Sequence, residues 1–483
     1  MRRITNIVAK NWILILIVVV GVFLRFYRLD DFAMFLSDQG RDAIIIKRIL
    51  TGEHFPAIGA PTSVGQVYLG PFYYYFIAPW LLLFNFKPVG LAFGVAFFSS
   101  LFLLINYFVV KKLINKKTAY ISTFFLALSS TLVDFSRFSW NPNLLPLFSF
   151  LTAYFTLESL RSKKWYFFAL AGAFLSLSVQ LHYLALFLGL PVAIVYVYYL
   201  VKTKGHLINK FINLFISVFF FVLFTLPLII FDLRHDFLNS KNFMLLFKSS
   251  QSLTSNKLDN LFNTFISLNK YSLNISLNTW QTVILLIFIL LSSLIILYRS
   301  KSQIKIFILF FLTCFLGLSL YSGPKFPHYL AMVFPFYFLI ISYFLAEISS
   351  DLLGKIVLVI FIFMYSLLSF PKFSFINMPA ANQIGQAQNV ANFLAEKINK
   401  KPFNISTWPV EFTEDSYLYF LELKGLIPAD RRKVEVTDQM FVLCNKEPCQ
   451  IIDSPSWNIS MFGKAKIQDQ WKVEDVKIYK LVR

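Results

Sequence analysis

Long apolar stretches recur along most of the chain, and they constrain its fold more than any other feature. A helix that crosses a membrane needs about 20 mainly apolar residues. The sequence offers eleven such stretches, with approximate edges at 12–26, 88–110, 118–134, 142–159, 165–181, 183–201, 211–231, 278–298, 305–322, 327–346 and 355–371. Residues 165–201 carry no formal charge and are too long for one span, so we divide them at His182-Tyr183. The chain is therefore expected to be an α-helical polytopic membrane protein.

The composition agrees with this expectation. Hydrophobic residues make up 57% of the chain and charged residues only 14%, whereas a soluble domain carries roughly 25% charged residues. The net charge is +20, and nearly all of the excess precedes residue 371, in short segments between apolar stretches. Because cationic loops orient a membrane protein, we interpret this charge as a topological signal and exclude nucleic-acid binding.

The basic residues alternate between the two ends of the predicted spans. If the N-terminus is cytoplasmic, every inner segment is basic, whereas the short outer turns carry only Arg137 and Lys325. The inner residues are Arg2, Arg3, Lys10, Lys111, Lys112, Lys116, Lys117, Arg161, Lys163, Lys164, Lys202, Lys204, Lys210, Arg299, Lys301, Lys305 and Lys355. The positive-inside rule then places the region after the last span outside the cell membrane. The first span, with no cleavage site behind it, is expected to be a retained anchor.

Two longer outer loops are predicted. The first covers about 27–87, and its apolar part from Gly70 to Phe86 would invert the later topology if it were a twelfth span. We interpret that part as an interfacial or re-entrant helix, rich in Tyr and Trp as such segments are. The residues Asp42–Leu50 are expected to form a helix in the surface plane. The second loop, about 232–277, is polar and rich in Asn and Ser.

The composition changes at about residue 372. Residues 372–483 have mixed charge, short alternating runs such as 433–436, and a helical pattern at 383–398. We predict a small soluble α/β domain there on the outer side, attached to a membrane domain of residues 1–371. Cys444 and Cys449 lie in this domain, and an outer location permits a disulfide between them or leaves two free thiols.

A polar segment, residues 36–42, directly follows the first span and is the main candidate for chemistry. On a helix, Asp38 and Asp42 share a face with Arg41 beside them. A carboxylate could accept a proton from a hydroxyl group or hold a cation. The alternative is a helix cap or a first-turn acid, which fits Asp42 nearly as well as a catalytic role. Arg41 could bind a phosphate or pair with either aspartate.

Other unusual polar residues lie at the same predicted membrane face. Arg137 and Trp140 belong to one outer turn, and Lys325 and His328 to another. A cation there could neutralise a phosphate, while an interfacial Trp and a structural histidine are the alternatives. His54 and His182 are further candidates at this face for which a structural role is favoured, and Glu53 beside His54 is a weaker candidate base. The sequence has no P-loop, no HExxH motif and no acidic residue in the middle of a span, where transporters commonly have one.

This arrangement resembles the GT-C glycosyltransferases, most closely the family-39-type enzymes, which include protein O-mannosyltransferases and the aminoarabinose transferases of lipid A. Those enzymes typically show Asp-Glu after the first span, then a helix, a Gly-containing turn and a Pro-Leu-Tyr-Tyr stretch. The matching run here is Asp38-Gln39, the helix to Leu50, Thr51-Gly52-Glu53 and Gly70-Pro71-Phe72-Tyr73-Tyr74, with His328-Tyr329 and Pro335 resembling a later element. Gln39 stands where the family usually has Glu, which puts metal coordination at this pair in doubt.

The resemblance implies transfer of a sugar from a polyprenyl phosphate to an acceptor hydroxyl of a protein or a lipid glycan, with inversion, on the outer face. It implies Asp38 as the base, with Arg137, Lys325 and His328 near the phosphate. Tyr73, Tyr74 and Trp140 would shape a groove for the tail or the sugar. No cofactor is required, although a divalent cation is compatible. The other hypotheses are a lipid or glycan transporter or flippase, and a non-catalytic scaffold whose outer domain binds a partner.

Overall fold

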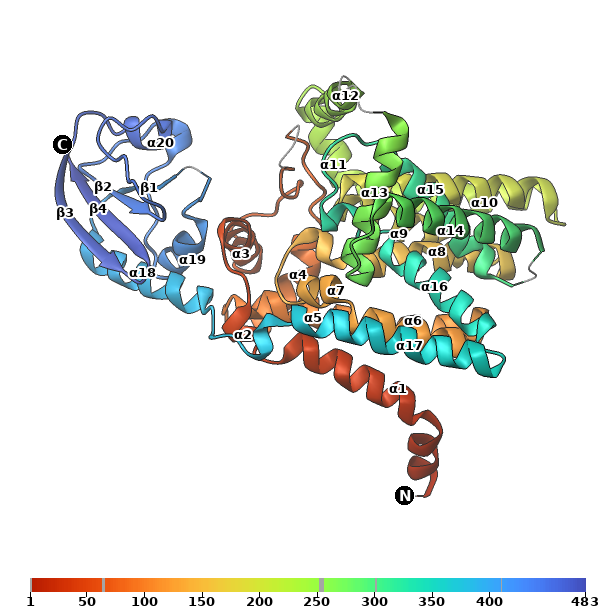
Figure 1. Ribbon diagram of the computed structural model, residues 1–483. Helices are drawn as coiled ribbons and strands as arrows, with labels where there is room; N and C mark the ends of the chain where they lie inside the picture. Colours follow the sequence, from red (N-terminus) through yellow and green to blue (C-terminus); the bar gives the residue numbers. More distant parts are fainter. Residues whose placement is uncertain (1, 63–65, 252–255, 300–301, 410) are drawn as a thin grey trace.

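The computed structural model describes residues 2–62, 66–251, 256–299, 302–409 and 411–483, and it is mostly helical (Figure 1). A helical bundle is followed by a small domain with one sheet, which lies at the opposite end of the molecule from the N-terminus. The α-helices before the sheet domain are α1 (Arg2–Phe26), α2 (Leu29–Phe32), α3 (Ser37–Leu50), α4 (Phe72–Leu83), α5 (Val89–Leu113), α6 (Lys116–Leu128), α7 (Ser130–Ser136), α8 (Leu145–Ser162), α9 (Trp165–Leu181), α10 (Gly189–Lys202), α11 (Leu207–Arg234), α12 (Leu238–Gln251), α13 (Lys257–Leu273), α14 (Thr279–Arg299), α15 (Ile304–Ser319), α16 (Phe334–Ile348) and α17 (Leu352–Ser369).

Short 3-10 turns join several of these helices. They are η1 (Asn141–Leu144), η2 (Tyr183–Leu188), η3 (Pro327–Leu330), η4 (Phe370–Lys372) and η5 (Ser374–Ile376). Each of the eleven predicted spans coincides with one or two helices. By length and composition, the described residues contain 5 helices that could cross a membrane, or up to 6 if the bent pair α6–α7 is one span. The apolar helices α4, α9, α15 and α16 are shorter.

The predicted span at 118–134 is broken at Ser129, where the chain is extended between α6 and α7 and bends by 61°. The break leaves carbonyl groups at the end of α6 without helical amide partners. Arg25 of α1 satisfies two of them, because its guanidinium donates to the carbonyl oxygens of Leu126 at 2.9 Å and Ala127 at 3.2 Å. The buried charge of Arg25 is therefore used to join α1 to the broken helix.

The prediction of a second outer loop at 232–277 was wrong. This segment forms α12 and α13, and α13 packs into the bundle. Its buried residues Phe265, Leu268 and Ser272 recur at helical spacing, and Tyr337 of α16 donates to Asn269 Oδ1 at 2.7 Å. The Asn and Ser content suggested a loop, but the apolar period of a helix was present.

The C-terminal domain contains a mixed sheet with the strand order β1-β2-β4-β3. Its remaining elements are α18 (Gln383–Ile398), β1 (Asn404–Trp408), α19 (Asp415–Leu423), η6 (Arg431–Lys433), β2 (Gln439–Cys444), α20 (Trp457–Ser460), β3 (Lys466–Val473) and β4 (Val476–Val482). β1 and β2 are parallel, and β4 pairs antiparallel with β2 and β3. The helix expected at 383–398 coincides with α18. The alternating run at 433–436 is not a strand, since it lies in η6 and the turn before β2.

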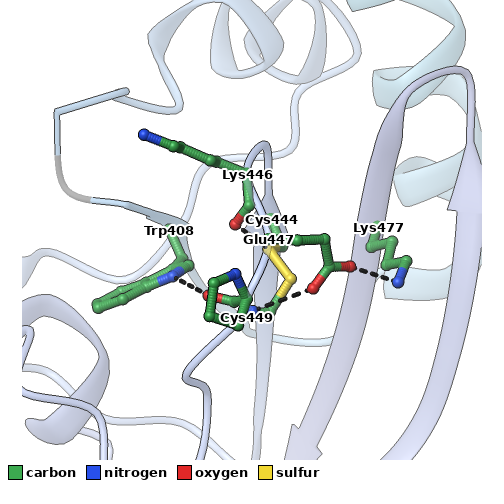
Figure 2. Close-up of a disulfide and its surroundings, with 7 residues drawn as sticks. Trp408, Cys444, Lys446, Glu447, Cys449 and Lys477 are labelled. Atoms are coloured by element: carbon green, nitrogen blue, oxygen red, sulfur yellow. Dashed lines mark hydrogen bonds and ion pairs between the residues drawn. A yellow bond between two sulfur atoms is a disulfide. The ribbon is translucent and has the colours of Figure 1, made fainter.

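Cys444 and Cys449 form a disulfide at the end of β2 (Figure 2). The enclosed turn is also held by neighbouring strands. Trp408 Nε1 of β1 donates to the carbonyl oxygen of Pro448 at 3.0 Å, and Glu447 forms an ion pair with Lys477 of β4. The disulfide thus closes a turn that is fixed from both sides.

The C-terminal domain packs directly on α3 through α19 (Figure 1). Gly40 of α3 permits this close approach, because a Cβ atom there would lie 2.3 Å from the backbone nitrogen of Ser416. Glu422 of α19 forms ion pairs with Lys47 and Arg48 of α3. Tyr419 also donates a hydrogen bond to the carbonyl oxygen of Phe86 at 2.5 Å. The polar helix α3 is therefore held between the bundle and the C-terminal domain.

Candidate active site

The helix α3 begins where the polar segment was expected, and Gln39 helps to start it. The N–H group of Leu36 donates to Gln39 Oε1 at 3.2 Å, so the amide reaches back to the residue before the helix. This is the second half of a capping box, in which the N3 side chain satisfies a free backbone donor. Gln39 therefore has a structural role at the position where the related enzymes usually have Glu.

Asp38, Arg41 and Asp42 form one ion-pair cluster on α3. Arg41 Nη1 donates to Asp38 Oδ1 at 2.8 Å, and Arg41 Nη2 donates to Asp42 Oδ1 at 2.8 Å. The side chains differ sharply in exposure: Asp38 is 49% exposed, Arg41 25% and Asp42 0%. Asp38 is thus the more accessible of the two carboxylates, while the buried carboxylate of Asp42 fixes the guanidinium of Arg41 through an ion pair.

Asp42 interacts with Tyr74 of α4 inside the protein. Its Oδ2 atom and the Tyr74 hydroxyl are both buried, and the two side chains act on each other's pKa. Burial raises the pKa of Asp42 to about 6, although the adjacent Arg41 acts in the opposite direction. Burial and the charge of Asp42 raise the pKa of Tyr74 well above its usual value. These groups form a buried polar floor beside Arg41.

Tyr73 connects this floor to the turn that follows α7. Its hydroxyl lies 2.6 Å from Ser139 Oγ, and both side chains are buried. Next to Ser139, the side chain of Asn141 is also buried, and neither its oxygen nor its nitrogen has a described partner. Ser139 and Asn141 were not among the predicted site residues, because a serine and an asparagine in a turn carry no distinctive sequence signal.

An aromatic cluster continues from this turn to η3. The rings of Trp140 and His328 are 4.7 Å apart, and His328 also lies 5.7 Å from His182 and 4.4 Å from Tyr329. The imidazole of His328 is partly buried, and its ring N–H group can offer a hydrogen bond to an anion.

Arg137 lies at this face, but its guanidinium is occupied. It donates to the carbonyl oxygens at the end of α1, namely those of Leu24, Arg25, Tyr27 and Arg28, at 2.9–3.3 Å. It also lies 3.7 Å from the ring centre of Phe375. This arrangement favours a structural role, in which Arg137 caps the C-terminus of α1, over the phosphate contact that the resemblance implied.

Lys325 and His54 also differ from expectation. Lys325 is buried and donates to the carbonyl oxygens of Leu318 and Tyr321, and burial lowers its pKa to about 8. His54 is exposed after the end of α3, and its neighbour Glu53 accepts a hydrogen bond from Lys47 at 2.8 Å. The structure thus brings Asp42, Tyr73, Tyr74, Trp140 and His328 into one chain of contacts, whereas His54 and Glu53 lie outside it.

The acidic residues do not form a cation site. Arg41 occupies the space between Asp38 and Asp42, and among the described residues no three His, Cys, Asp or Glu side chains come together. A divalent cation needs several oxygen ligands around one point. The donor set therefore does not fit a resident metal ion.

An open apolar groove of about 540 Å³ runs beside the site. Its walls come from the loop after α3, from Tyr75 of α4 and from α11, including Leu223, Leu226 and Ile230. Tyr75 donates to the carbonyl oxygen of Pro56 at 2.9 Å, which fixes one wall. The same helix α4 therefore presents Tyr73 and Tyr74 to the polar floor and Tyr75 to the groove.

The fold and this site define a membrane protein with the GT-C glycosyltransferase fold, so the resemblance is confirmed. Residues 69–231 match the family model described as dolichyl-phosphate-mannose-protein mannosyltransferase. The structure of ArnT from Cupriavidus metallidurans bound to undecaprenyl phosphate is similar, with a TM-score of 0.62, 12% identity and 98% of each chain covered. The apo state of ArnT gives a TM-score of 0.59 with 11% identity and the same coverage.

A more distant structure shares part of the same fold. The oligosaccharyltransferase of Archaeoglobus fulgidus in the apo form has a TM-score of 0.54 and 12% identity, with 87% of this chain and 64% of that chain covered. A search of curated protein sequences finds no significant match. At such low identity the likeness extends to the fold, and any activity has to be argued from the residues of the site.

Proposed function

We propose that this protein transfers a sugar from a polyprenyl-phosphate donor to an acceptor hydroxyl on the outer membrane face. The observation that carries the proposal is the half-exposed Asp38, which Arg41 and the buried Asp42 hold in a polar cluster on α3. Tyr75, the chain neighbour of Tyr74 on α4, lines an apolar groove. A lipid-linked sugar needs both surroundings, because its tail is apolar and its phosphate and sugar are polar.

Asp38 is the proposed base. It accepts the proton of the acceptor hydroxyl while the oxygen attacks the anomeric carbon, and the bond from that carbon to the donor phosphate breaks. The proton moves to the Asp38 carboxylate, and the electron pair leaves with the phosphate. Attack from the side opposite the phosphate inverts the anomeric carbon. General bases of this kind contribute roughly 10²–10⁴-fold to rate.

Arg41 and Asp42 are proposed to position Asp38 and to line the pocket. The phosphate would receive a hydrogen bond from His328, and the ammonium group of Lys325 would add positive charge. Tyr73, Tyr74 and Trp140 would shape the sugar subsite. The groove along Tyr75 and α11 would take part of the isoprenoid tail. ArnT of Cupriavidus metallidurans, which has a similar fold, binds undecaprenyl phosphate, and this supports a donor of that chemical class.

The proposed topology has eleven spans, a cytoplasmic N-terminus and an extracytoplasmic C-terminal domain. The distribution of basic residues supports it, because Lys and Arg collect at the helix ends that lie away from α3 and the C-terminal domain. The acceptor, a protein or a lipid glycan, would approach from the outer side. The end of α17 at Ser369 supports a domain boundary near residue 372.

The transporter hypothesis has less support from the bundle. A transporter needs polar groups that are free to bind cargo near the middle of the membrane. Arg25 of α1 is buried, but its guanidinium donates to Gly21 O, Leu126 O, Ala127 O and Ser99 Oγ. Four of its five N–H groups therefore fasten helices together, which favours a structural role over cargo binding.

The proposal is tested with purified protein and a panel of polyprenyl-phosphate sugars offered with peptide and glycolipid acceptors. We expect release of polyprenyl phosphate together with a glycosylated acceptor whose new bond has the opposite anomeric configuration. Retention of configuration would contradict the single attack described above. Movement of the intact donor across vesicles without release of polyprenyl phosphate would favour a flippase.

A further inference from the structure

A second cavity lies at the end of the bundle opposite the candidate active site. Its volume is about 660 Å³, and it is bounded by α8, α10, α14 and α15. α8 starts after the turn that contains Trp140 and ends at Ser162, next to Arg161. α10 starts after His182 and runs away from the C-terminal domain (Figure 1). The end of α15 at Ser319 lies toward the candidate active site, whereas the cavity is lined by residues at the start of α15. The cavity is therefore expected at the other membrane face.

The mouth of this cavity is positively charged. Arg161 and Lys305 line it, and its described lining residues include no carboxylate. Lys305 makes no ion pair with any residue in the described ranges. Arg161 donates to Glu158 Oε1 at 3.0 Å, but the same oxygen also accepts from Lys112 at 2.9 Å. The buried carboxylate of Glu158 is thus shared by Arg161 and Lys112, and Lys305 has no carboxylate partner among the described residues.

The body of the cavity is apolar and borders the membrane. Leu157 and Val195 are buried in its floor, whereas Ile194 and Tyr198 of α10 expose 42% and 57% of their surfaces. Ile306 and Leu309 of α15 continue the apolar wall below Lys305. A cationic mouth at the helix ends and an apolar body along the helices suit an amphiphile with an anionic head.

We propose that this cavity binds one anionic glycerophospholipid of the leaflet that contains Arg161 and Lys305. The phosphate would lie between the guanidinium and the ammonium group, and an acyl chain would follow α10 and α15. This lipid takes no part in the transfer reaction, so the inference goes beyond the proposed function. Lys and Arg near an anionic lipid surface contribute about 1 kcal/mol each, which is about 5-fold in affinity for each side chain.

The test measures binding of phosphatidylglycerol to the full-length protein by native mass spectrometry in detergent. The variant carries Arg161→Gln and Lys305→Gln, and Lys355→Gln, an exposed cation at the same end of the bundle, is the matched control. We expect the double variant to bind phosphatidylglycerol about 25-fold more weakly, and the control to bind like the wild type. Equal binding by the double variant would overturn the proposal.

Other ligands and two further variants test which molecule occupies the cavity and whether its binding depends on the candidate active site. Phosphatidylcholine and inorganic phosphate should bind much more weakly than phosphatidylglycerol, and tighter binding of a polyprenyl phosphate at this cavity would overturn the assignment. Ile194→Trp fills the apolar wall of the cavity without changing its charge, and it should also weaken phosphatidylglycerol binding. This variant tests the cavity independently of the folding of the double variant. Asp38→Asn should leave lipid binding unchanged, which separates this inference from the proposed activity.

Discussion

Asp38 and Asp42 have the same side chain but different surroundings, and Arg41 lies between them. Asp42 is fully buried and interacts with Arg41 and Tyr74, whereas Asp38 is half exposed and accepts a hydrogen bond from Arg41. Paired carboxylates with different environments commonly divide their roles in catalysis. We infer that Asp42 fixes the position of Arg41 and that Arg41 in turn aims Asp38 at the pocket.

The pKa of Asp42 makes a prediction about stability. Folding raises this pKa from 3.8 to about 6, so the folded state binds more protons than the unfolded state between these values. Stability therefore falls as pH rises from about 4 to about 6, by about 3 kcal/mol for this group. Asp42→Asn should unfold at the wild-type temperature near pH 4 and should become relatively more stable above pH 6. If the unfolding temperatures of Asp42→Asn and the wild type differed by the same amount at every pH, the raised pKa of Asp42 would be contradicted.

At the scale of elements, the active-site turn depends on the end of α1. Arg137 donates to four carbonyl groups there, while Arg25 closes the break between α6 and α7. Neither role involves a substrate. Both follow from the need to satisfy backbone carbonyls that have no helical partner in a bundle with little water.

Arg137→Gln should therefore destabilise the protein. The shorter amide cannot reach all four carbonyl oxygens, and a loss of about 3 kcal/mol is expected when buried polar groups lose a charged partner. The measurement is the thermal unfolding midpoint in detergent, with Arg432→Gln as a control because Arg432 is exposed on the C-terminal domain. Unchanged stability combined with lost donor binding would instead place Arg137 on the phosphate.

The sequence predicted most helices because apolar runs and basic loops have simple physical causes. It located α3, α18 and the polar face of the molecule, but it missed the insertion of α13, whose Asn and Ser residues are buried by neighbouring helices. It did not show that Arg137 and Lys325 donate to backbone carbonyls, because a cation near the membrane edge looks the same in sequence whether it meets a phosphate or a carbonyl. Only the positions of α1, α7 and α15 in the structure show whether such a cation contacts a backbone carbonyl group.

At the scale of the whole molecule, the C-terminal domain and the bundle share α3. Gly40 faces the backbone of Asp415 and Ser416, and Glu422 pairs with Lys47 and Arg48 on the same helix. The domain thus covers the face of α3 next to Asp38 and Arg41.

Gly40→Ala tests this docking with a single added methyl group. Alanine has a higher helix propensity than glycine, so the helical structure of α3 should be retained. The new Cβ atom, however, would lie 2.3 Å from Ser416 N. We expect faster hydrogen exchange in α19 and earlier proteolysis between α17 and α18. Gly189→Ala is the matched control, because a Cβ atom there meets nothing within 4 Å. Equal protection of α19 in both variants would show that the domains do not pack as described.

The most direct test of the central claim compares Asp38→Asn with the wild type in the release of polyprenyl phosphate from the best donor of the panel. Asp30→Asn, an exposed change on the same face, serves as the control. We predict a loss of roughly 100-fold or more for Asp38→Asn, the scale of a missing general base, with donor binding retained and the control fully active. Equal turnover by Asp38→Asn and the wild type would contradict the assignment of Asp38 as the base.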